Sequence, residues 1–185
     1  MPIGMKRIRA FTLMLPFLLV ATPSLAIAAD SIPDGPHRPI RTTDDRLRKL
    51  LDDGMRTSPT FRALVERLDA SDIVVYLRCD GAPLHAADGR LTFLSSAGGF
   101  RYVVVRVAHL QSRERQIAII AHELRHAIEI ADAPQIVDGP SLVREYKRIG
   151  YVSVGSALPG ITFDSRAAVQ AGTQVMRELL DNEDD

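Results

Sequence analysis

Residues 122–126 read His-Glu-Leu-Arg-His, the pattern H-E-x-x-H. The surrounding run, 117–131, is mainly apolar and contains no glycine or proline, which predicts a helix. Two histidines four residues apart lie one turn above each other on one helix face. Neutral imidazoles placed in this way can bind one Zn²⁺ at about 2.0–2.1 Å each. Glu123 can face the same metal and take a proton from its bound water, so the pattern predicts a hydrolytic zinc site.

The two histidines leave the site incomplete, because a catalytic zinc usually has three protein ligands and a water. Three acidic residues compete for the third position. Glu129 shares the helix face but lies about 4.5 Å of helical rise beyond His126, and its alternative role is a hydrogen bond to a histidine. Glu145 follows His126 by 19 residues and Asp164 follows it by 38. Asp164 has an alternative role too, because Asp is a preferred helix N-cap.

The elements that must position these residues are helices on either side of a small sheet. Residues 43–45 open a first helix that should end at Gly54, and Ser58-Pro59 opens a second that runs to Asp69. Runs rich in β-branched and aromatic residues predict three strands, and the short links between them favour antiparallel neighbours. These strands are expected at 73–78, 91–95 and 100–107.

The motif helix should begin after Ser112 and end before Pro134. One apolar stripe of it should pack on the sheet, while His122, His126 and Glu129 fall on a separate side. A short helix should follow Ser141, and Phe163-Asp164 should begin the last helix. The expected fold class is α+β, a three-stranded antiparallel sheet packed on the motif helix, with scaffold helices before and after.

The N-terminal residues predict export. Residues 1–28 combine a basic start, an apolar core and small residues before a cleavage point, as in a secretory signal peptide. A proline-rich linker, 29–42, a single domain, 43–180, and an acidic tail, 181–185, should follow. The mature protein is then expected in the bacterial periplasm or outside the cell. The alternative is an adaptor that residues 1–29, left uncleaved, anchor in the membrane. A membrane span needs about 20 apolar residues, and prolines interrupt this segment.

Charge and cysteine content narrow the partners. Removal of residues 1–28 takes away three basic and no acidic side chains, which leaves 20 basic and 23 acidic ones and a net charge of −3. That balance argues against nucleic acid as a partner, and no membrane contact is expected after signal cleavage. Cys79 is the only cysteine, so no internal disulfide can form.

From Ser58 to Leu180, the order of helix, strands, H-E-x-x-H helix and later acidic helix resembles the minimal core of zincin metallopeptidases. The resemblance is closest to the gluzincins, in which a glutamate on a downstream helix completes the metal site. The glycine and third histidine that follow the motif in metzincins are missing here, because Ala-Ile-Glu follows His126.

The chain also resembles small exported bacterial proteins that carry the same helix, in which an aromatic residue followed by Glu opens the final helix. Phe163-Asp164 occupies that place with the shorter acid. The resemblance therefore implies Asp164 as the third metal ligand, with Glu145 as the runner-up.

These features predict an exported zinc metallopeptidase-like enzyme that hydrolyses amide bonds of a peptide or protein substrate. It would use one zinc ion and Glu123 as general base. Tyr146, Tyr151 and His109 are candidates to stabilise the oxyanion, and the substrate would lie along the edge of the third strand. The alternatives are a catalytically inactive zinc-binding or interaction domain with the zincin fold, and an ordinary helix whose histidines are merely packed or exposed.

Overall fold

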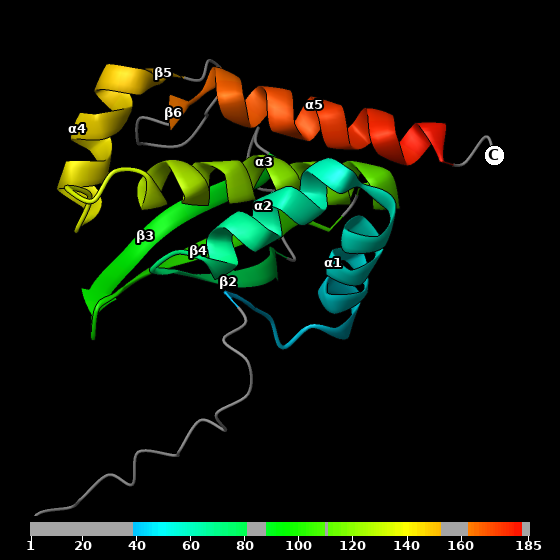
Figure 1. The fold of residues 1–185 in the computed structure, drawn as a ribbon, viewed down its shortest axis with the longest axis horizontal. Coiled ribbons are helices and arrows are strands. Elements are labelled where there is room, and N and C mark those ends of the chain that lie inside the picture. The colour runs from blue at the N-terminus through cyan, green and yellow to red at the C-terminus, as the bar shows by residue number, and fades with distance from the viewer. Residues whose placement is uncertain (1–38, 81–87, 110, 153–162, 183–185) are drawn as a thin grey trace, which may run out of the picture. The chain divides into compact units, whose positions relative to one another are not determined.

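The computed structural model describes residues 39–80, 88–109, 111–152 and 163–182. The chain divides into two units, Met1–Pro33 and Asp34–Asp185, and every described residue belongs to the second. The expected signal peptide, most of the linker and residues 183–185 lie outside the described residues. Figure 1 labels the elements, which are β1 (Ile40–Arg41), α1 (Asp45–Thr57), α2 (Pro59–Asp69), β2 (Ile73–Asp80), β3 (Gly89–Ala97), β4 (Phe100–Ala108), α3 (Arg113–Ala131), α4 (Gly139–Ile149), β5 (Tyr151–Val152), β6 (Phe163–Asp164) and α5 (Arg166–Asp181).

The fold is α+β, but the expected three-stranded antiparallel sheet is wrong. Four strands form a mixed sheet in the order β1-β2-β4-β3, with β2 parallel to β4 and β3 antiparallel to β4. β5 and β6 form a separate antiparallel pair. Residues 40–41, which we assigned to the linker, form β1 beside β2.

The composition of the strands explains this order. β4 carries a continuous apolar run, 103–105, which is buried, and such a run suits a strand that has neighbours on both sides. β3 is richer in polar residues and more exposed, which suits an edge. Because β4 is central, its edges are both paired, and the substrate path that we expected along this third strand is wrong. The edge strands of this sheet are β1, which has two residues, and β3, which has nine.

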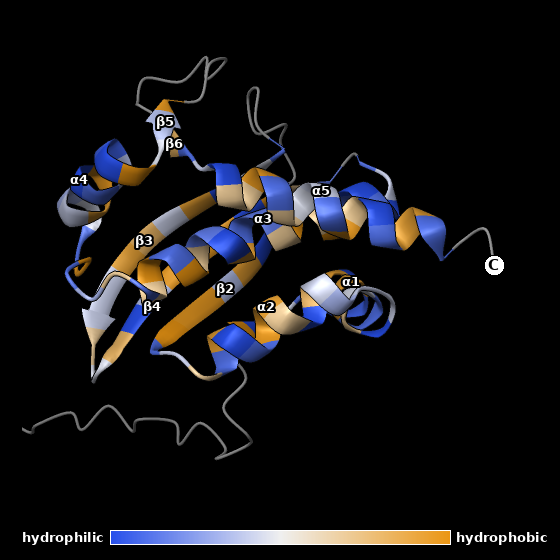
Figure 2. Cartoon of the chain, turned by 45° about the horizontal axis from the view of Figure 1, so that its top comes forward, coloured by the Kyte–Doolittle hydropathy of each residue, from blue (hydrophilic) through white to orange (hydrophobic). Residues whose placement is uncertain are grey.

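The helices form two layers on one face of the sheet. α2 and α3 lie across the sheet, and α5 packs on α3 on the side away from the strands (Figures 1 and 2). The main core lies between the sheet and these helices and contains fully buried side chains such as Phe61, Leu68, Ile117, Ile120 and Leu124. Burial of one such side chain contributes about 1.5–3 kcal/mol, so this layer holds α3 in place.

His122, His126 and Glu129 lie together on a separate side of α3, as expected, but most of that side is buried too. Thirteen of its nineteen residues are buried, including polar Glu123, His126 and Glu129. The reason is that α5 covers the side of α3 that faces away from the sheet. The boundaries agree with expectation, because Ser112 caps the helix by accepting from the Arg115 N–H, and the helix ends at Ala131.

Arg101 ties the C-terminal end of α3 to the sheet. Its guanidinium group donates two 2.7 Å hydrogen bonds to the carboxylate of Asp72, and it donates to the carbonyls of Ile130 at 2.6 Å and Ala133 at 2.9 Å. The last carbonyls of a helix lack partners within the helix, and a cation satisfies them well. The hydrogen bond from Arg101 lowers the pKa of Asp72. This side chain therefore fixes the end of α3 against β4.

None of the described helices combines the length and apolar character needed to cross a membrane.

The first helix does not end at Gly54, as we expected, but continues to Thr57. Gly54 is buried, and a Cβ there would lie 2.9 Å from the ring of Phe61 and 3.0 Å from Ile117. Both neighbours are fully buried and cannot move away easily. The glycine is therefore retained for close packing of α1 rather than as a helix stop.

This contact predicts the effect of Gly54→Ala. Alanine favours a helix by about 1 kcal/mol over glycine, but overpacking costs about 1–3 kcal/mol, so the variant should be less stable in urea unfolding. Gly139→Ala is the matched control, because Gly139 begins α4 and a Cβ there meets nothing within 4 Å. A Gly54→Ala protein as stable as Gly139→Ala would contradict this packing argument.

Candidate metal centre

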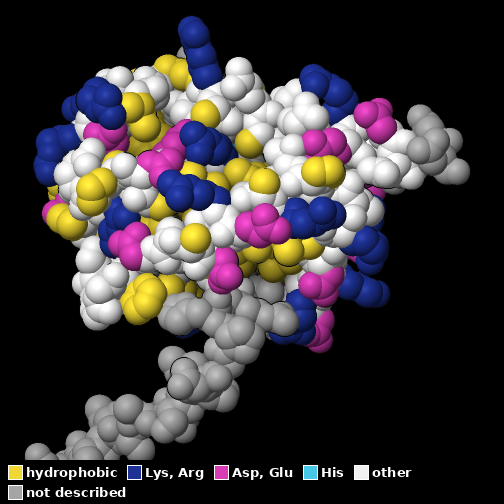
Figure 3. Space-filling model, viewed as in Figure 1, with side chains coloured by type: hydrophobic (Ala, Val, Ile, Leu, Met, Phe, Trp, Pro, Cys, Tyr) yellow, Lys and Arg dark blue, Asp and Glu magenta, His cyan; other side chains and the backbone are white. Residues whose placement is uncertain are grey.

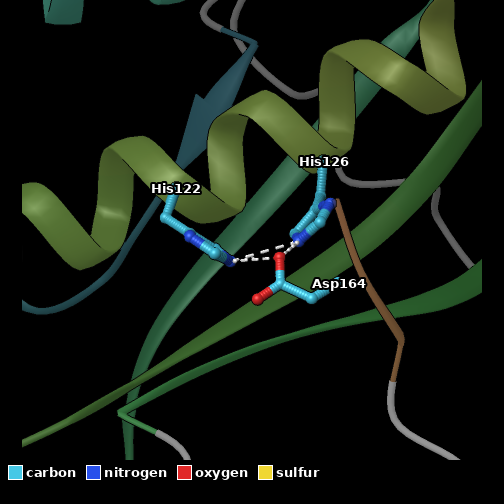
Figure 4. Close-up of side chains that lie close together, drawn as sticks. All are labelled: His122, His126 and Asp164. Atoms are coloured by element: carbon cyan, nitrogen blue, oxygen red, sulfur yellow. Dashed lines mark hydrogen bonds and ion pairs between the residues drawn. The ribbon is translucent and has the colours of Figure 1, made fainter. Parts of the chain in front are cut away.

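Three side chains from two distant parts of the chain meet beside α3. His122 and His126 project from successive turns of α3, and Asp164 reaches them from β6 (Figure 4). The two Nε2 atoms are 3.2 Å apart, and the Oδ1 atom of Asp164 lies 3.4 Å from that of His122 and 3.5 Å from that of His126. The structure thus brings together the three residues that the sequence analysis favoured as ligands.

The triangle of donor atoms fits a metal ion. Ligand atoms about 2.0–2.1 Å from a tetrahedral zinc lie about 3.3–3.4 Å from one another, and the three observed separations are 3.2, 3.4 and 3.5 Å. Two imidazole nitrogens and one carboxylate oxygen are a donor set that suits zinc. Among the described residues, this is the one group of three or more His, Cys, Asp or Glu side chains close enough to share an ion.

The exposure of the three side chains is unequal. His126 is 7% exposed, whereas His122 and Asp164 are 24% and 20% exposed. One side of the triangle is therefore within reach of solvent, while the other is closed by protein. Among the described residues in the view of Figure 3, no histidine is seen on the surface.

A buried hydrogen-bond network holds the His126 ring. Its Nδ1–H donates to Oε2 of Glu129 at 2.9 Å, and the Tyr146 hydroxyl donates to the same oxygen at 2.7 Å while lying 2.8 Å from Nδ1. Ser165, the N-cap of α5, donates to Oε1 of Glu129 at 2.5 Å. With Nδ1 bonded to Glu129, Nε2 is the ring nitrogen that points toward Asp164 and is the one available to a metal ion once its proton has left. A carboxylate placed in this way orients a metal-binding imidazole.

The network places Glu129 outside the ligand triangle and in the alternative role that we gave it, a hydrogen bond to a histidine. Burial tends to raise its pKa, but the hydrogen bonds from His126, Ser165 and Tyr146 outweigh this and lower the pKa. Glu129 is therefore ionised inside the protein. Burial and the charge of Glu129 raise the pKa of Tyr146, so its hydroxyl stays protonated and donates to Glu129.

Glu123 lies on the same helix and is nearly fully buried, with 5% exposure. Burial raises its pKa to about 7, and the negative charge of Asp164 adds to this. The opposing influences are the charge of His126, the backbone N–H of Leu91 on β3 and the charge of Arg90. A carboxyl group with a pKa near neutral can both accept and return a proton at physiological pH.

The charges of the triangle are coupled. Burial lowers the pKa of His122, and the nearby positive charge of His126 lowers it further despite Asp164. Burial also opposes protonation of His126, but its hydrogen bonds to Asp164 and Glu129 and the charge of Glu123 raise its pKa to about 9. The pKa of Asp164 is lowered, because His126 and His122 outweigh its burial. Without a metal ion, the His126 ring is therefore positively charged at neutral pH, and the carboxyl group of Asp164 is ionised.

The other candidates lie apart from the triangle. Glu145 on α4 accepts hydrogen bonds from Gln135 at 3.0 Å and from Arg148, and it does not join the histidines. His109 lies 3.5 Å from Cys79 and is bonded to Gln116 through its carbonyl. Tyr151 is half exposed and hydrogen-bonded to Asp164, and its pKa is raised by burial and by that carboxylate. Of the three oxyanion candidates, Tyr151 is the one that contacts a proposed ligand from the exposed side.

Sequence reasoning missed Ser165 and the inner role of Tyr146. Ser165 directly follows Asp164, and a serine before a helical run is a recognisable cap signal. We had placed the start of the last helix at Phe163-Asp164, but these residues form β6, and α5 begins at Arg166. Because we expected the helix to begin at residues 163–164, we did not identify Ser165 as its cap. The Ser165 side chain both caps α5 and donates to Glu129.

A pocket of about 600 Å³ opens beside the centre, between α3, β5 and the start of α5. It shares Glu129 and Ser165 with the buried network, and its outer lining includes Arg125, Tyr151 and Arg166. The three proposed ligands are not part of its lining. The pocket is therefore adjacent to the centre, although none of the three proposed ligands lines it.

Comparisons of this chain with protein-family models, with curated proteins and with solved structures find no match.

The triangle predicts which substitutions remove the metal. The protein should take up one zinc ion, and His122→Ala or Asp164→Ala should weaken binding by roughly 100-fold or more, because even residues that only support ligands contribute about 10–100-fold. Elemental analysis after dialysis measures this directly. Glu145→Ala is the control and should leave binding unchanged. Full zinc retention by the His122 variant would exclude this centre.

The raised pKa of His126 predicts that metal uptake is linked to protons. Below about pH 9 the metal-free ring is protonated, and a metal must displace that proton, so affinity should rise about tenfold per pH unit up to that point and then level off. Calorimetry at pH 7.5 in buffers of different ionisation enthalpy should show release of about one proton per zinc. Zinc uptake without proton release at this pH would contradict the assignment.

Proposed function

We propose that this chain is an exported, zinc-dependent hydrolase of peptide bonds with a zincin-like arrangement around the motif helix. The observation that carries the proposal is the donor triangle of His122, His126 and Asp164, whose edges of 3.2–3.5 Å suit tetrahedral zinc. The apolar N-terminal segment supports export. The resemblance in the order of elements supports the zincin assignment, although β1 and the parallel pairing of β2 with β4 go beyond the sheet that we expected.

Zinc bound at the triangle would act as a Lewis acid that polarises a carbonyl and lowers the pKa of a water molecule. The chain supplies the rest. Glu123, with a pKa of about 7, accepts the proton of the attacking water and returns it to the leaving amine. Glu129 and Tyr146 keep the His126 ring fixed with its Nε2 free. Tyr151, exposed beside Asp164, is placed to donate to a developing negative charge.

The substrate path follows from the sheet. β3 has an unpaired edge and contacts α3, and the carboxyl group of Glu123 lies against its residues near Leu91. An extended peptide can add to such an edge through main-chain hydrogen bonds, which recognise its backbone rather than its side chains. A peptide along β3 would therefore run past the general base.

A non-catalytic zinc-binding or interaction domain is the second candidate. A purely structural zinc site is usually closed by four protein ligands, whereas a catalytic site keeps a position open. The described residues supply three donors, and His122 and Asp164 are partly exposed. This partial opening favours catalysis over a structural site.

The test of the function is Glu123→Gln. The variant should keep its zinc, because Glu123 is not in the donor triangle, and it should lose cleavage of a peptide library by about 10²–10⁴-fold, the usual contribution of a general base. Mass spectrometry of the library and elemental analysis of the protein give the two measurements.

Glu145→Gln is the matched control, because it makes the same chemical change on a buried glutamate outside the triangle. Equal cleavage by the wild type and Glu123→Gln would exclude Glu123 as the base. A zinc-loaded wild type that cleaves no member of the library would favour the non-catalytic domain.

A further inference from the structure

The face of the sheet that turns away from the helices carries arginines and tyrosines. Along β2 and β4, every second residue belongs to the main core under the helices, as with Val75, Leu77, Val103 and Val105. The residues between them point to the opposite face, because successive side chains of a strand alternate. No described helix packs on that face. The side chains that lie on it include Arg41, Tyr76, Arg78, Arg90, Tyr102 and Arg106.

Three of these arginines stand in one row across three neighbouring strands. Arg78 of β2 is in register with Arg106 of β4, and Arg106 is in register with Arg90 of β3. Adjacent strands are about 4.8 Å apart, and like charges directly opposite each other destabilise a sheet. Among the described residues, no hydrogen bond or ion pair joins any of the three to a carboxylate, although Arg90 exerts a weak electrostatic effect on Glu123. Asp80 follows Arg78 by two residues on the same face of β2, but its side chain is outside the described part of the chain. Within the described part, the row therefore has no carboxylate partner.

Several arginines elsewhere on the surface form ion pairs with carboxylates. On the face viewed in Figure 3, basic side chains lie next to acidic ones. Ion pairs elsewhere in the described part of the chain include Arg67 with Asp132 at 2.6 Å and Arg115 with Asp88 at 2.7 Å. Arg78 is exposed, whereas Arg90 and Arg106 are half-buried. The row thus differs from these pairs, because none of its three arginines is paired with a carboxylate among the described residues.

Two tyrosines complete this face. The rings of Tyr76 and Tyr102 stack with centroids 6.3 Å apart at 19°. They share their face with Val74 and Val104, which are 1% and 3% exposed although neither belongs to the main core. An aromatic pair with polar tips, flanked by guanidinium groups, gives the face an amphipathic character.

We propose that this face, defined by Arg78, Arg90, Arg106, Tyr76 and Tyr102, binds the surface of a membrane that contains anionic phospholipids. Arginines near such a surface are attracted to its phosphate groups, and tyrosine is enriched where a membrane meets water. A strand surface with its charges spread across three strands suits an extended anionic surface, whereas a small anion needs a concave site.

This proposal differs from our expectation that the domain contacts no membrane after signal cleavage. It is independent of the proposed hydrolase activity, because the row lies on the sheet face opposite to α3. The donor triangle lies on the helix side, so a domain seated on a membrane through the row would keep the centre turned toward solvent.

The experiment measures co-sedimentation of the full chain with vesicles of phosphatidylcholine alone and with vesicles in which about a third of the lipid is phosphatidylglycerol. The neutral vesicles report any binding through the apolar N-terminal segment. Binding through the row should add affinity for the anionic vesicles at about 0.1 M salt and lose it at about 1 M, where the Debye length falls from about 10 Å to about 3 Å.

The decisive variant is Arg78→Gln combined with Arg106→Gln. Affinity for the anionic vesicles should fall about 30-fold, because each arginine near such a surface contributes about fivefold. The control is Lys49→Gln combined with Arg177→Gln, which removes the same charge from exposed positions on α1 and α5 and should change affinity less than about twofold, since it leaves the row intact. In urea unfolding, the row variant should be at least as stable as the wild type, because it removes repulsion between neighbouring strands. The control variant should unfold at the same urea concentration as the wild type.

Three results would overturn the proposal. They are equal affinity for neutral and anionic vesicles, an undiminished affinity of the row variant, and an equal loss in both double variants, which would indicate only overall charge. Tighter binding of a duplex DNA oligonucleotide than of the anionic vesicles, lost in the row variant, would assign the face to nucleic acid instead.

Discussion

The ionised carboxylate of Glu129, buried inside the protein, is the constraint on which the rest of the site depends. A buried charge without partners costs several kcal/mol, and this one is satisfied by His126, Tyr146 and Ser165 together. The partners come from α3, α4 and the cap of α5, so the carboxylate is satisfied only when these three elements are packed against one another. The same contacts set the orientation of the His126 ring. Stability of this region and geometry of the donor triangle are therefore two results of one hydrogen-bond network.

The covering of α3 by α5 determines how open the centre is. α5 turns small and apolar residues toward the interior, including Ala168, Gly172, Val175 and Leu179. A Cβ at Gly172 would lie 3.1 Å from the carbonyl oxygen of Ala118 and 3.3 Å from the Cβ of His122, so this glycine allows α5 to approach α3 closely beside His122. His126 is nearly fully buried, and Glu123 is buried against β3, whereas His122 and Asp164 are partly exposed. Burial raises the pKa of Glu123, while the two partly exposed ligand candidates are within reach of solvent.

The sequence predicted the local structure and the donor residues better than the topology. The caps at Ser58 and Ser112 and the length of α3 follow from short-range patterns, and these elements were found as expected. Strand order depends on long-range pairing, and the short links between strands suggested antiparallel neighbours when β4 in fact inserts between β2 and β3. The apolar run of β4 and the polar character of β3 do indicate that β4 is a central strand and β3 an edge strand. The partners of Glu129 could not be predicted, because Tyr146 and Ser165 are distant in sequence and carry no spacing signal.

The shorter acid at position 164 raises the question of how it reaches the histidines. Asp164 lies in a strand, not in a helix, and β6 pairs with β5 so that Asp164 is in register with Tyr151. Gly150 precedes this pair, and a Cβ there would lie 2.6 Å from the carbonyl oxygen of Asp164 and 2.9 Å from that of Tyr146. The absent side chain therefore lets the backbone of β6 come close to the end of α4 and advance toward α3.

Once it is there, the carboxylate is held by the backbone N–H of Ser165 at 2.6 Å and by Tyr151. A glutamate at position 164 would add about 1.5 Å of reach to a backbone that already stands close enough for donor separations of 3.4 and 3.5 Å. Its carboxylate would overshoot the triangle unless β6 withdrew, and withdrawal would break the contacts around Gly150. The position of the backbone thus accounts for aspartate here, and the departure from the longer acid is matched by a change in the element that carries it.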